Sequence, residues 1–404
     1  MRQRILVSAL SAGALAVVGA TAAMASASAQ TGAAPTPYTA GKHAAKVCSA
    51  TTAAHTAVCD AVKLVDAKGA APRSSTPPST GLTPSGLQDA YKLTGLKANG
   101  RTVAIVDAYG YPSLERDLGV YRSQFGLSAC TTANGCLKVI DQNGGTSLPK
   151  FNAGWAGEQA LDVDAVSAAA PDAKIIVVQA KSASFADLGA AVQTAAKQPG
   201  VVAISNSYGG GDADDATYGA YYNHPGIAVT ASTGDNGYQG GSYPASSSYT
   251  TAVGGTSLVA ASNSRGWSES VWSGAGSGCS TYNTALSAAS SFDTGCSKRA
   301  MADVSAAADP GKGGMAIYYP TSRTASTWAQ FGGTSEAAPI IAAVYALSGN
   351  TTGYANALPY GHASSLFDVT SGSNGSCPTT QWCNARTGWD GPTGLGTPNG
   401  AGAF

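Results

Sequence analysis

Charged residues are scarce in this chain. Asp, Glu, Lys and Arg make up 11% of its 404 residues, and the 23 acidic side chains balance the 23 basic ones. A balanced charge excludes the basic surface that binds nucleic acids or anionic membranes, so we expect neither as a partner. Small polar residues must cover much of the surface, which is unusual for a cytosolic protein.

Histidine and long apolar segments are also rare. The chain has four histidines and no Cys-x-x-Cys pair, which argues against a zinc site. After residue 29 no apolar segment is long enough to span a bilayer. Before it, Arg2 and Arg4 precede an apolar run that ends in Ala27-Ser28-Ala29. This pattern predicts a signal peptide over residues 1–29 and a secreted protein.

The eight cysteines fit export, because disulfides persist in oxidising compartments. Four local disulfides are the simplest pairing, although spacing alone leaves the connectivity open. The near neighbours are Cys48 and Cys59, Cys130 and Cys136, Cys279 and Cys296, and Cys377 and Cys383.

Two regions follow the predicted signal peptide. Residues 30–81 are rich in Ala, Thr, Ser and Pro, and Ala71–Pro84 resembles an exposed linker. We interpret 30–81 as a short propeptide or leader with its linker, processed in or before the linker. The alternative is a simple N-terminal extension of the mature protein. Residues 82–404 would form the main domain.

In that domain, apolar segments rich in β-formers alternate with amphipathic helical segments. This alternation predicts an α/β fold with a mainly parallel sheet. Expected strands are 102–107, 174–179, 201–205 and 227–231, and expected helices are 113–125, 158–169 and 185–196. Sites in such folds lie at the carboxyl ends of strands, where Asp107, SNSYGG (205–210) and STGDNG (232–237) fall.

The segment 331–347, FGGTSEAAPIIAAVYAL, joins a glycine turn to an apolar helix pattern. Because proline is tolerated near the first turn, Pro339 predicts a helix that begins close to Ser335. A serine there lies beside unpaired backbone N–H groups at the positive end of the helix dipole, which suits a nucleophile. The alternative interpretation is a Ser/Thr helix cap.

A serine nucleophile needs a general base. His43 and His55 lie in the leader, and the loops around His224 and His362 suggest ordinary surface histidines. By contrast, Glu158 and its neighbour Asp162, four residues on, project from one face of an apolar helix.

Two poorly solvated carboxyl groups at this spacing share a proton, so Glu158 becomes a candidate base oriented by Asp162. The alternative is a solvated acidic helix start favoured by the dipole. Asp235 is a third candidate, because a protonated carboxyl group donates a hydrogen bond to an oxyanion. Its alternative is an Asx turn.

Several motifs in order resemble one family, the sedolisins or serine-carboxyl peptidases. They are GEQALD, SNSYGG, STGDNG, YTTAVGGTSL, ADVSAAADP, FGGTSEAAP and DVTSG…GWDGPTGLGTP, from about Leu82 to the C-terminus. The resemblance implies a subtilisin-like three-layer fold, with a mainly parallel central sheet flanked by helices. It also implies Ser335 as nucleophile, Glu158 as base, Asp162 as its partner and Asp235 as oxyanion acid. A substrate would pair as an added strand with Ser207, Tyr208 and Gly209.

The sequence departs from the family pattern in three places. The leader is shorter than the folded prodomain of many members, and Tyr208 stands where many have Trp. Asp107 stands where some members have a glutamate linked to the catalytic carboxyl groups, and where a subtilisin has its triad aspartate.

The resemblance further implies one structural Ca²⁺ near the C-terminus. Asp368 and Asp390 would bind it with the backbone carbonyls of Val369, Arg386 and Gly388, an oxygen-only set that suits calcium. Arg386 stands where glycine is usual. The alternative is a Gly/Asp-rich turn closed by a disulfide.

The function expected from the sequence is a secreted, acid-active, monomeric serine-carboxyl endopeptidase acting on proteins or peptides. Two alternatives remain open. One is a conventional subtilisin-like peptidase that uses His224 or His362, and the other is a catalytically inactive relative that binds peptides.

Overall fold

The computed structural model describes residue 1 and residues 41–70, 74–350 and 352–404. The expected signal peptide (1–29), the first part of the expected leader and residues 71–73 of the linker lie outside the described residues. The chain divides into units 1–31 and 32–404, and every described helix and strand belongs to the second unit. Among the described helices, none combines the length and apolar character needed to cross a bilayer.

An eight-stranded sheet forms the centre of the described domain. All of its pairings are parallel except that between β11 and β12, and β15 (Val304–Ala307) also pairs with β11. The path across the sheet is β12 (Trp267–Val271), β11 (Thr251–Ala260), β9 (Ala228–Ser232), β7 (Val201–Asn206), β4 (Thr102–Ala108), β6 (Lys174–Ala180) and β5 (Leu137–Asp141).

The centre of this sheet explains the location of the site. The sequence TVAIVDA of β4 is buried at every residue, as expected for a strand covered on both faces. Its neighbours are β6 on one side and β7 on the other, so the strand order reverses beside β4. The carboxyl end of β4, where Asp107 lies, is therefore the switch point at which ligands bind in such sheets.

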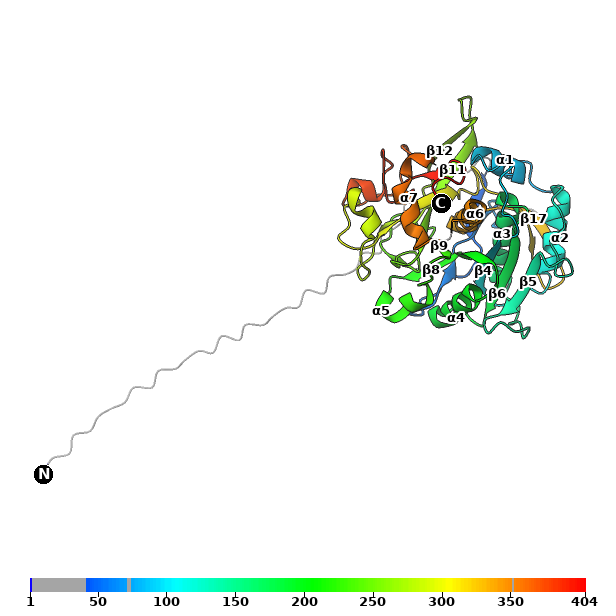
Figure 1. Cartoon of the computed structure of the whole chain (residues 1–404), viewed down its shortest axis with the longest axis horizontal. Coiled ribbons are helices and arrows are strands. Elements are labelled where there is room, and N and C mark those ends of the chain that lie inside the picture. The colour runs from blue at the N-terminus through cyan, green and yellow to red at the C-terminus, as the bar shows by residue number, and fades with distance from the viewer. Residues whose placement is uncertain (2–40, 71–73, 351) are drawn as a thin grey trace. The chain divides into compact units, whose positions relative to one another are not determined.

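Helices cover both faces of the sheet (Figure 1). The long helices α3 (Ala153–Ala169) and α6 (Thr334–Ser348) pack together on one face, and α4 (Phe185–Ala196) lies against β4, β6 and β7 on the other. Residues 334–347 of α6 are all buried, because this apolar helix is enclosed by other elements. The remaining α-helices are α1 (Pro84–Ala90), α2 (Leu114–Gln124), α5 (Asp215–Tyr218) and α7 (Leu358–Gly361).

Smaller sheets attach the N-terminal strands to the domain. One sheet has the order β1 (His43–Lys46), β3 (Val62–Val65), β17 (Ser326–Gly332) and β16 (Ala316–Pro320). Another has the order β10 (Ser242–Tyr243), β8 (Tyr208–Gly211) and β2 (Val58–Cys59). Residues 43–65, part of the expected leader, therefore contribute strands to two sheets of the described domain. Two further pairs join β13 (Gly278–Cys279) to β14 (Ala300–Met301) and β18 (Leu366–Phe367) to β19 (Thr397–Pro398).

The expected α/β fold with a mainly parallel sheet is confirmed, and most predicted elements are present within one or two residues. The eight cysteines form the four expected disulfides. One predicted helix start was wrong. Helix α3 begins at Ala153, where Asn152 accepts a hydrogen bond from the amide of Trp155, so Glu158 lies inside the helix.

Helix α6 begins at Thr334, so the predicted start close to Ser335 is confirmed. Pro339 is its sixth residue rather than a residue of the first turn. A proline at this position removes the hydrogen bond to the carbonyl four residues earlier, which is that of Ser335. The hydroxyl of Ser207 lies 3.3 Å from this carbonyl oxygen, so a polar group from another element faces it.

A buried ion pair between Arg299 and Asp303 lies beside strands β11 and β15 of the central sheet. Arg299 is 1% exposed and donates to both carboxylate oxygens of Asp303, which is fully buried. Asp303 also accepts from the Tyr360 hydroxyl and the Ala252 amide, 2.7 Å away in each case.

Replacing Asp303 with Ala should lower the free energy of unfolding by about 3–5 kcal/mol, because a buried guanidinium would lose its counter-charge. The control is Asp293→Ala, which breaks the exposed pair with Arg386 and should cost less than about 1 kcal/mol. Denaturant unfolding would measure both. Equal costs would show that the buried pair contributes nothing beyond a surface pair.

Candidate active site

Ser335 is the second residue of α6 and is fully buried. Gly333 precedes the helix with a φ of 102°, and a Cβ there would lie 2.1 Å from the carbonyl oxygen of Asp60. Only glycine combines this backbone conformation with such a close approach. The Ser335 hydroxyl donates to the carbonyl oxygen of Ser207 at 3.2 Å, and the Ser335 amide, at the start of the helix, donates to the carbonyl oxygen of Asp60 at 3.3 Å.

Three carboxyl groups gather next to Ser335. Glu158 and Asp162 come from successive turns of α3, and Asp107 comes from the end of β4. All three are fully buried. The Ser207 hydroxyl donates to Asp162 at 2.8 Å, whereas both carboxylate oxygens of Glu158 and Asp107 have no hydrogen-bond partner among the described residues.

Burial dominates the electrostatics of this group, since no lysine or arginine in the described chain forms an ion pair with it. Burial raises the pKa of Glu158 well above its ordinary value, the charges of Asp162 and Asp107 raise it further, and the Ser335 hydroxyl opposes the rise. Burial likewise raises the pKa of Asp162 and of Asp107. Buried carboxyl groups that raise one another's pKa do not all ionise together, so Glu158, Asp162 and Asp107 share protons.

Asp235 lies on the other side of the serine, in the loop after β9. Its Oδ1 accepts from the amide of Thr334 at 2.8 Å and from the Thr334 hydroxyl at 3.0 Å. Its Oδ2 lies 3.4 Å from Nζ of Lys46, and its side chain is fully buried. Burial raises the pKa of Asp235, while Lys46 and Thr334 oppose the rise. The side chain is thus fixed at the start of α6, one residue before Ser335.

The predicted substrate-binding residues lie along the edge of β8. Tyr208 and Gly209 are the first residues of that strand, and Ser207 immediately precedes it. Tyr208 is fully buried and its hydroxyl donates to the side chain of Asn206 at 2.8 Å. Here β8 pairs with β2 of the N-terminal region, so its edge already carries an added strand.

The histidines take no part in this arrangement. His224 is held by a contact between its Nε2 and the carbonyl oxygen of Tyr221 at 2.9 Å, and burial lowers its pKa. His362 is exposed and contacts the carbonyl oxygen of Leu358. Within the described residues no hydrogen bond joins either histidine to Ser335.

The residues expected to hold calcium are close together. Asp368 accepts from the amide of Gly388 at 2.9 Å, and Asp390 accepts from the amide of Arg386 at 3.3 Å. Asp390 is fully buried with no cationic partner in the described chain, and burial, reinforced by Asp368, raises its pKa to about 7. An uncompensated buried carboxyl group beside a second one fits a hard cation. In the described residues no group of three or more acidic, histidine or cysteine side chains is arranged so that it could hold a metal ion.

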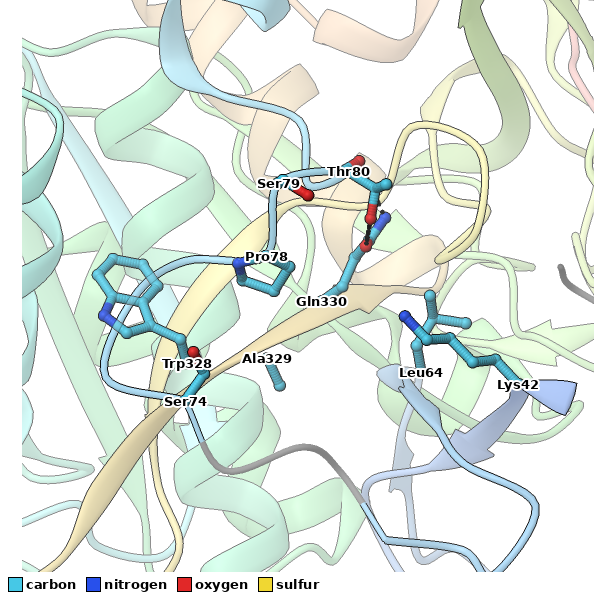
Figure 2. A pocket seen from close by; sticks show the side chains of 9 residues that line it. All are labelled: Lys42, Leu64, Ser74, Pro78, Ser79, Thr80, Trp328, Ala329 and Gln330. Atoms are coloured by element: carbon cyan, nitrogen blue, oxygen red, sulfur yellow. Dashed lines mark hydrogen bonds between the residues drawn. The ribbon is translucent and has the colours of Figure 1, made fainter. Parts of the chain in front are cut away.

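A surface pocket of about 250 Å³ lies apart from these residues (Figure 2). It is lined by Leu64 of β3, by residues 328–330 of β17 and by the stretch from Pro78 to Thr80. The Thr80 hydroxyl donates to Gln330 at 2.7 Å across it. Ser335 and the carboxyl groups do not line this pocket, so it is a recess beside β3 and β17.

Sequence reasoning missed Lys46, Asp60 and Thr334. Thr334 could have been predicted from the sequence, because it directly precedes the predicted nucleophile and its amide belongs to the helix start. No pattern in the neighbouring sequence indicates that Lys46 and Asp60 belong to the site. Pairings between strands of the expected leader and the rest of the domain bring them there.

Comparisons with known proteins identify the family of this chain. The model of the subtilase family matches residues 151–357, just over half of the chain. Kumamolisin from Bacillus sp. (strain MN-32) is 31% identical over 368 residues, which cover 81% of this chain and 64% of that protein. Sedolisin from Pseudomonas sp. (strain 101) is 28% identical over 341 residues, which cover 74% and 56%. The chain thus spans less than two thirds of the length of these two relatives.

Solved structures extend the likeness to three dimensions. Pseudomonas sedolisin, described as a serine-carboxyl proteinase in complex with two molecules of pseudo-iodotyrostatin, superposes with a TM-score of 0.66 at 26% identity. The match covers 79% of this chain and 95% of that one. Sphericase shares the fold, with a TM-score of 0.50 at 17% identity, and covers 81% of this chain and 99% of its own. The chain therefore belongs to the subtilase family of serine-type peptidases, and within it to the sedolisin type.

Proposed function

We propose that this protein is a secreted, acid-active serine-carboxyl endopeptidase that hydrolyses peptide bonds in proteins or peptides. The observation that carries the proposal is a serine at a helix start between a buried, proton-retaining carboxyl network and a second buried carboxyl group, that of Asp235. Secretion is supported by four disulfides, which suit an oxidising compartment.

In the first step the Ser335 oxygen attacks the substrate carbonyl carbon, and its proton passes to Glu158, which is the ionised member of the pair while Asp162 holds the shared proton. Asp162 shares a proton with Glu158. It also accepts a hydrogen bond from the hydroxyl of Ser207, the residue before the substrate-binding strand β8. The negative charge on the carbonyl oxygen is met by the amide of Ser335 and by protonated Asp235. Glu158 then returns the proton to the leaving nitrogen as the C–N bond breaks, and water hydrolyses the ester on Ser335 by the same route.

The proposed roles of Ser335, Glu158 and Asp162 can be tested by single and double substitutions. Ser335→Ala should reduce kcat on denatured casein on the order of 10⁴-fold or more, and Glu158→Gln and Asp162→Asn should each remove most activity. The double carboxyl variant should be little worse than either single variant, because the pair acts as a unit. Initial rates at acidic pH would measure these effects.

The control for that test is the pair His224→Ala and His362→Ala, which should change the rate little. Loss of activity in a folded His224 variant would instead support a conventional triad. Full activity in a Ser335→Ala preparation free of contaminants would leave the proposed nucleophile without support.

A second test concerns the alkaline limb of the pH profile. Asp235 donates to the oxyanion only while protonated, so activity is present below its raised pKa and declines as pH rises through it. Asp235→Asn keeps an N–H donor and should retain partial activity with a weaker decline toward neutral pH. Asp235→Ala should lose about 10²–10³-fold in kcat.

The comparison of kcat–pH profiles for wild type and Asp235→Asn decides the point. Coincident alkaline limbs would remove Asp235 from control of that limb. An Asp235→Ala enzyme as fast as wild type would remove it from the oxyanion site.

We also propose that Asp368 and Asp390, with the carbonyls of Val369, Arg386 and Gly388, hold one structural Ca²⁺. The ion would supply the positive charge that buried Asp390 lacks.

Because a ligand that binds only the folded state stabilises it by about 2.7 kcal/mol at a concentration of 100 Kd, chelation of the calcium should lower the melting temperature. Asp390→Asn should abolish the response to calcium, and Asp293→Asn on a neighbouring loop should keep it. An unchanged melting temperature in chelator, with no calcium by elemental analysis, would contradict the site.

A further inference from the structure

The backbone on both sides of Asp235 is hydrogen-bonded to a segment that is remote in the sequence, residues 274–277, here called the supporting segment. Before Asp235, the carbonyl oxygen of Gly234 accepts from the amide of Gly276 at 2.6 Å. After Asp235, the amide of Gly237 donates to the carbonyl oxygen of Gly274 at 2.9 Å. The supporting segment therefore determines where the backbone of this carboxyl group lies.

The main chains pack against each other without intervening side chains. A Cβ at Gly276 would lie 2.1 Å from the carbonyl oxygen of Thr233, and a Cβ at Gly237 would lie 2.4 Å from the carbonyl oxygen of Asn374. Only glycine allows approaches as close as these. Because such packing leaves no free space, a shift of the supporting segment would move the backbone of Asp235 with it.

One buried side chain joins the supporting segment to the loop that carries Asp235. Asn374 is 4% exposed, and its Nδ2 donates to the carbonyl oxygen of Ala275 at 2.6 Å and to the Ser277 hydroxyl at 2.8 Å. Its main-chain carbonyl oxygen accepts from the amide of Tyr238 at 3.2 Å. Its Oδ1 has no hydrogen-bond partner among the described residues, so this side chain acts through its N–H donors.

Asn374 is itself held in the C-terminal loop, residues 371–391. Its amide donates to the carbonyl oxygen of Cys383 at 3.0 Å, and a disulfide joins Cys383 to Cys377. The carbonyl oxygen of Trp382 accepts from the supporting segment at 2.6 Å, and the Trp382 ring stacks on that of Tyr238. A covalently closed loop therefore supports the backbone around Asp235.

The proposed reaction makes the placement of Asp235 important, because an oxyanion donor must lie about 2.7–3.1 Å from the developing charge. Thr334 fixes only Oδ1 of Asp235, so the direction of Oδ2 depends on the backbone of residue 235. The titratable groups whose charges act on Asp235 are Lys46 of β1 and Asp60, which follows β2. The supporting segment, Gly-Ala-Gly-Ser, contains no titratable side chain.

We propose that Asn374 is a positioning residue for catalysis, which holds Asp235 at the place from which its carboxyl group can donate to the oxyanion. The proposal rests on the proposed peptidase function and extends it to a residue that acts through Asp235. The observation that carries it is the buried amide of Asn374, which bonds to the supporting segment while its backbone bonds to the Asp235 loop.

The first experiment separates kcat from KM on denatured casein at acidic pH. Asn374→Ala should lower kcat at least about tenfold and change KM less than about twofold, because Asp235 stabilises the transition state rather than the bound substrate. The matched control is Asn384→Ala on the same loop, which should keep kcat within about twofold. The amide of Asn384 bonds to the carbonyl oxygen of Thr380 within that loop.

A second variant keeps the test valid if Asn374→Ala does not fold. Asn374→Leu preserves the approximate shape of the side chain and removes its N–H donors, and it should lower kcat in the same way. Thermal unfolding of each variant shows that the protein is folded at the assay temperature.

The alkaline limb of the kcat–pH profile provides a readout that a general loss of stability would not change. Burial is the largest cause of the raised pKa of Asp235, so a loosened loop that admits water lowers this pKa. Asp235 then loses its proton at a lower pH, and the alkaline limb of Asn374→Ala should move to lower pH. In an Asp235→Asn background residue 235 does not titrate, so the same substitution should leave the limb in place and lower kcat less.

The outcomes distinguish the inference from the proposed function. Wild-type kcat in folded Asn374→Ala and Asn374→Leu proteins would overturn the inference, and so would equal effects of Asn374→Ala with Asp235 and with Asn at position 235. In both cases casein hydrolysis by the wild type would leave the proposed function intact. Absence of casein hydrolysis by the wild type would overturn the proposed function itself.

Discussion

Burial of carboxyl groups without cationic partners is the constraint on which this site depends. Glu158 and Asp162 can be buried on α3 because protons, rather than lysines or arginines, neutralise them. That neutralisation lets α3 pack directly against α6, so the helix that carries Ser335 is enclosed in apolar surroundings. The same low-dielectric environment strengthens each hydrogen bond around the serine. The packing of α3 against α6 and the chemistry of the site therefore both depend on partial protonation of these carboxyl groups.

Local patterns in the sequence predicted much of this arrangement. The buried character of β4 follows from its apolar β-branched residues, and Asp107 was expected at its carboxyl end, where it lies. The spacing of Glu158 and Asp162 placed both on one helix face. These inferences succeeded because strand burial and helix periodicity are properties of neighbouring residues.

Contacts between distant residues could not be predicted in the same way. Lys46 and Asp235 are 189 positions apart, and β1, β2 and β3 are strands of two to four residues with little periodicity. Their pairing partners are edges created by the rest of the fold. The surroundings of Pro339 are a smaller case of the same kind, because the Ser207 hydroxyl that faces the carbonyl freed by the proline comes from another element.

The disulfide between Cys48 and Cys59 has a consequence for the fate of the N-terminal segment. It closes a short loop that ends next to Asp60, so the strand that pairs with β8 is held by a covalent bond as well as by the sheet. Closing a loop restricts mainly the unfolded chain. A reducing agent should therefore loosen the chain beside Ser335 before it affects the central sheet, whose strands contain no cysteine.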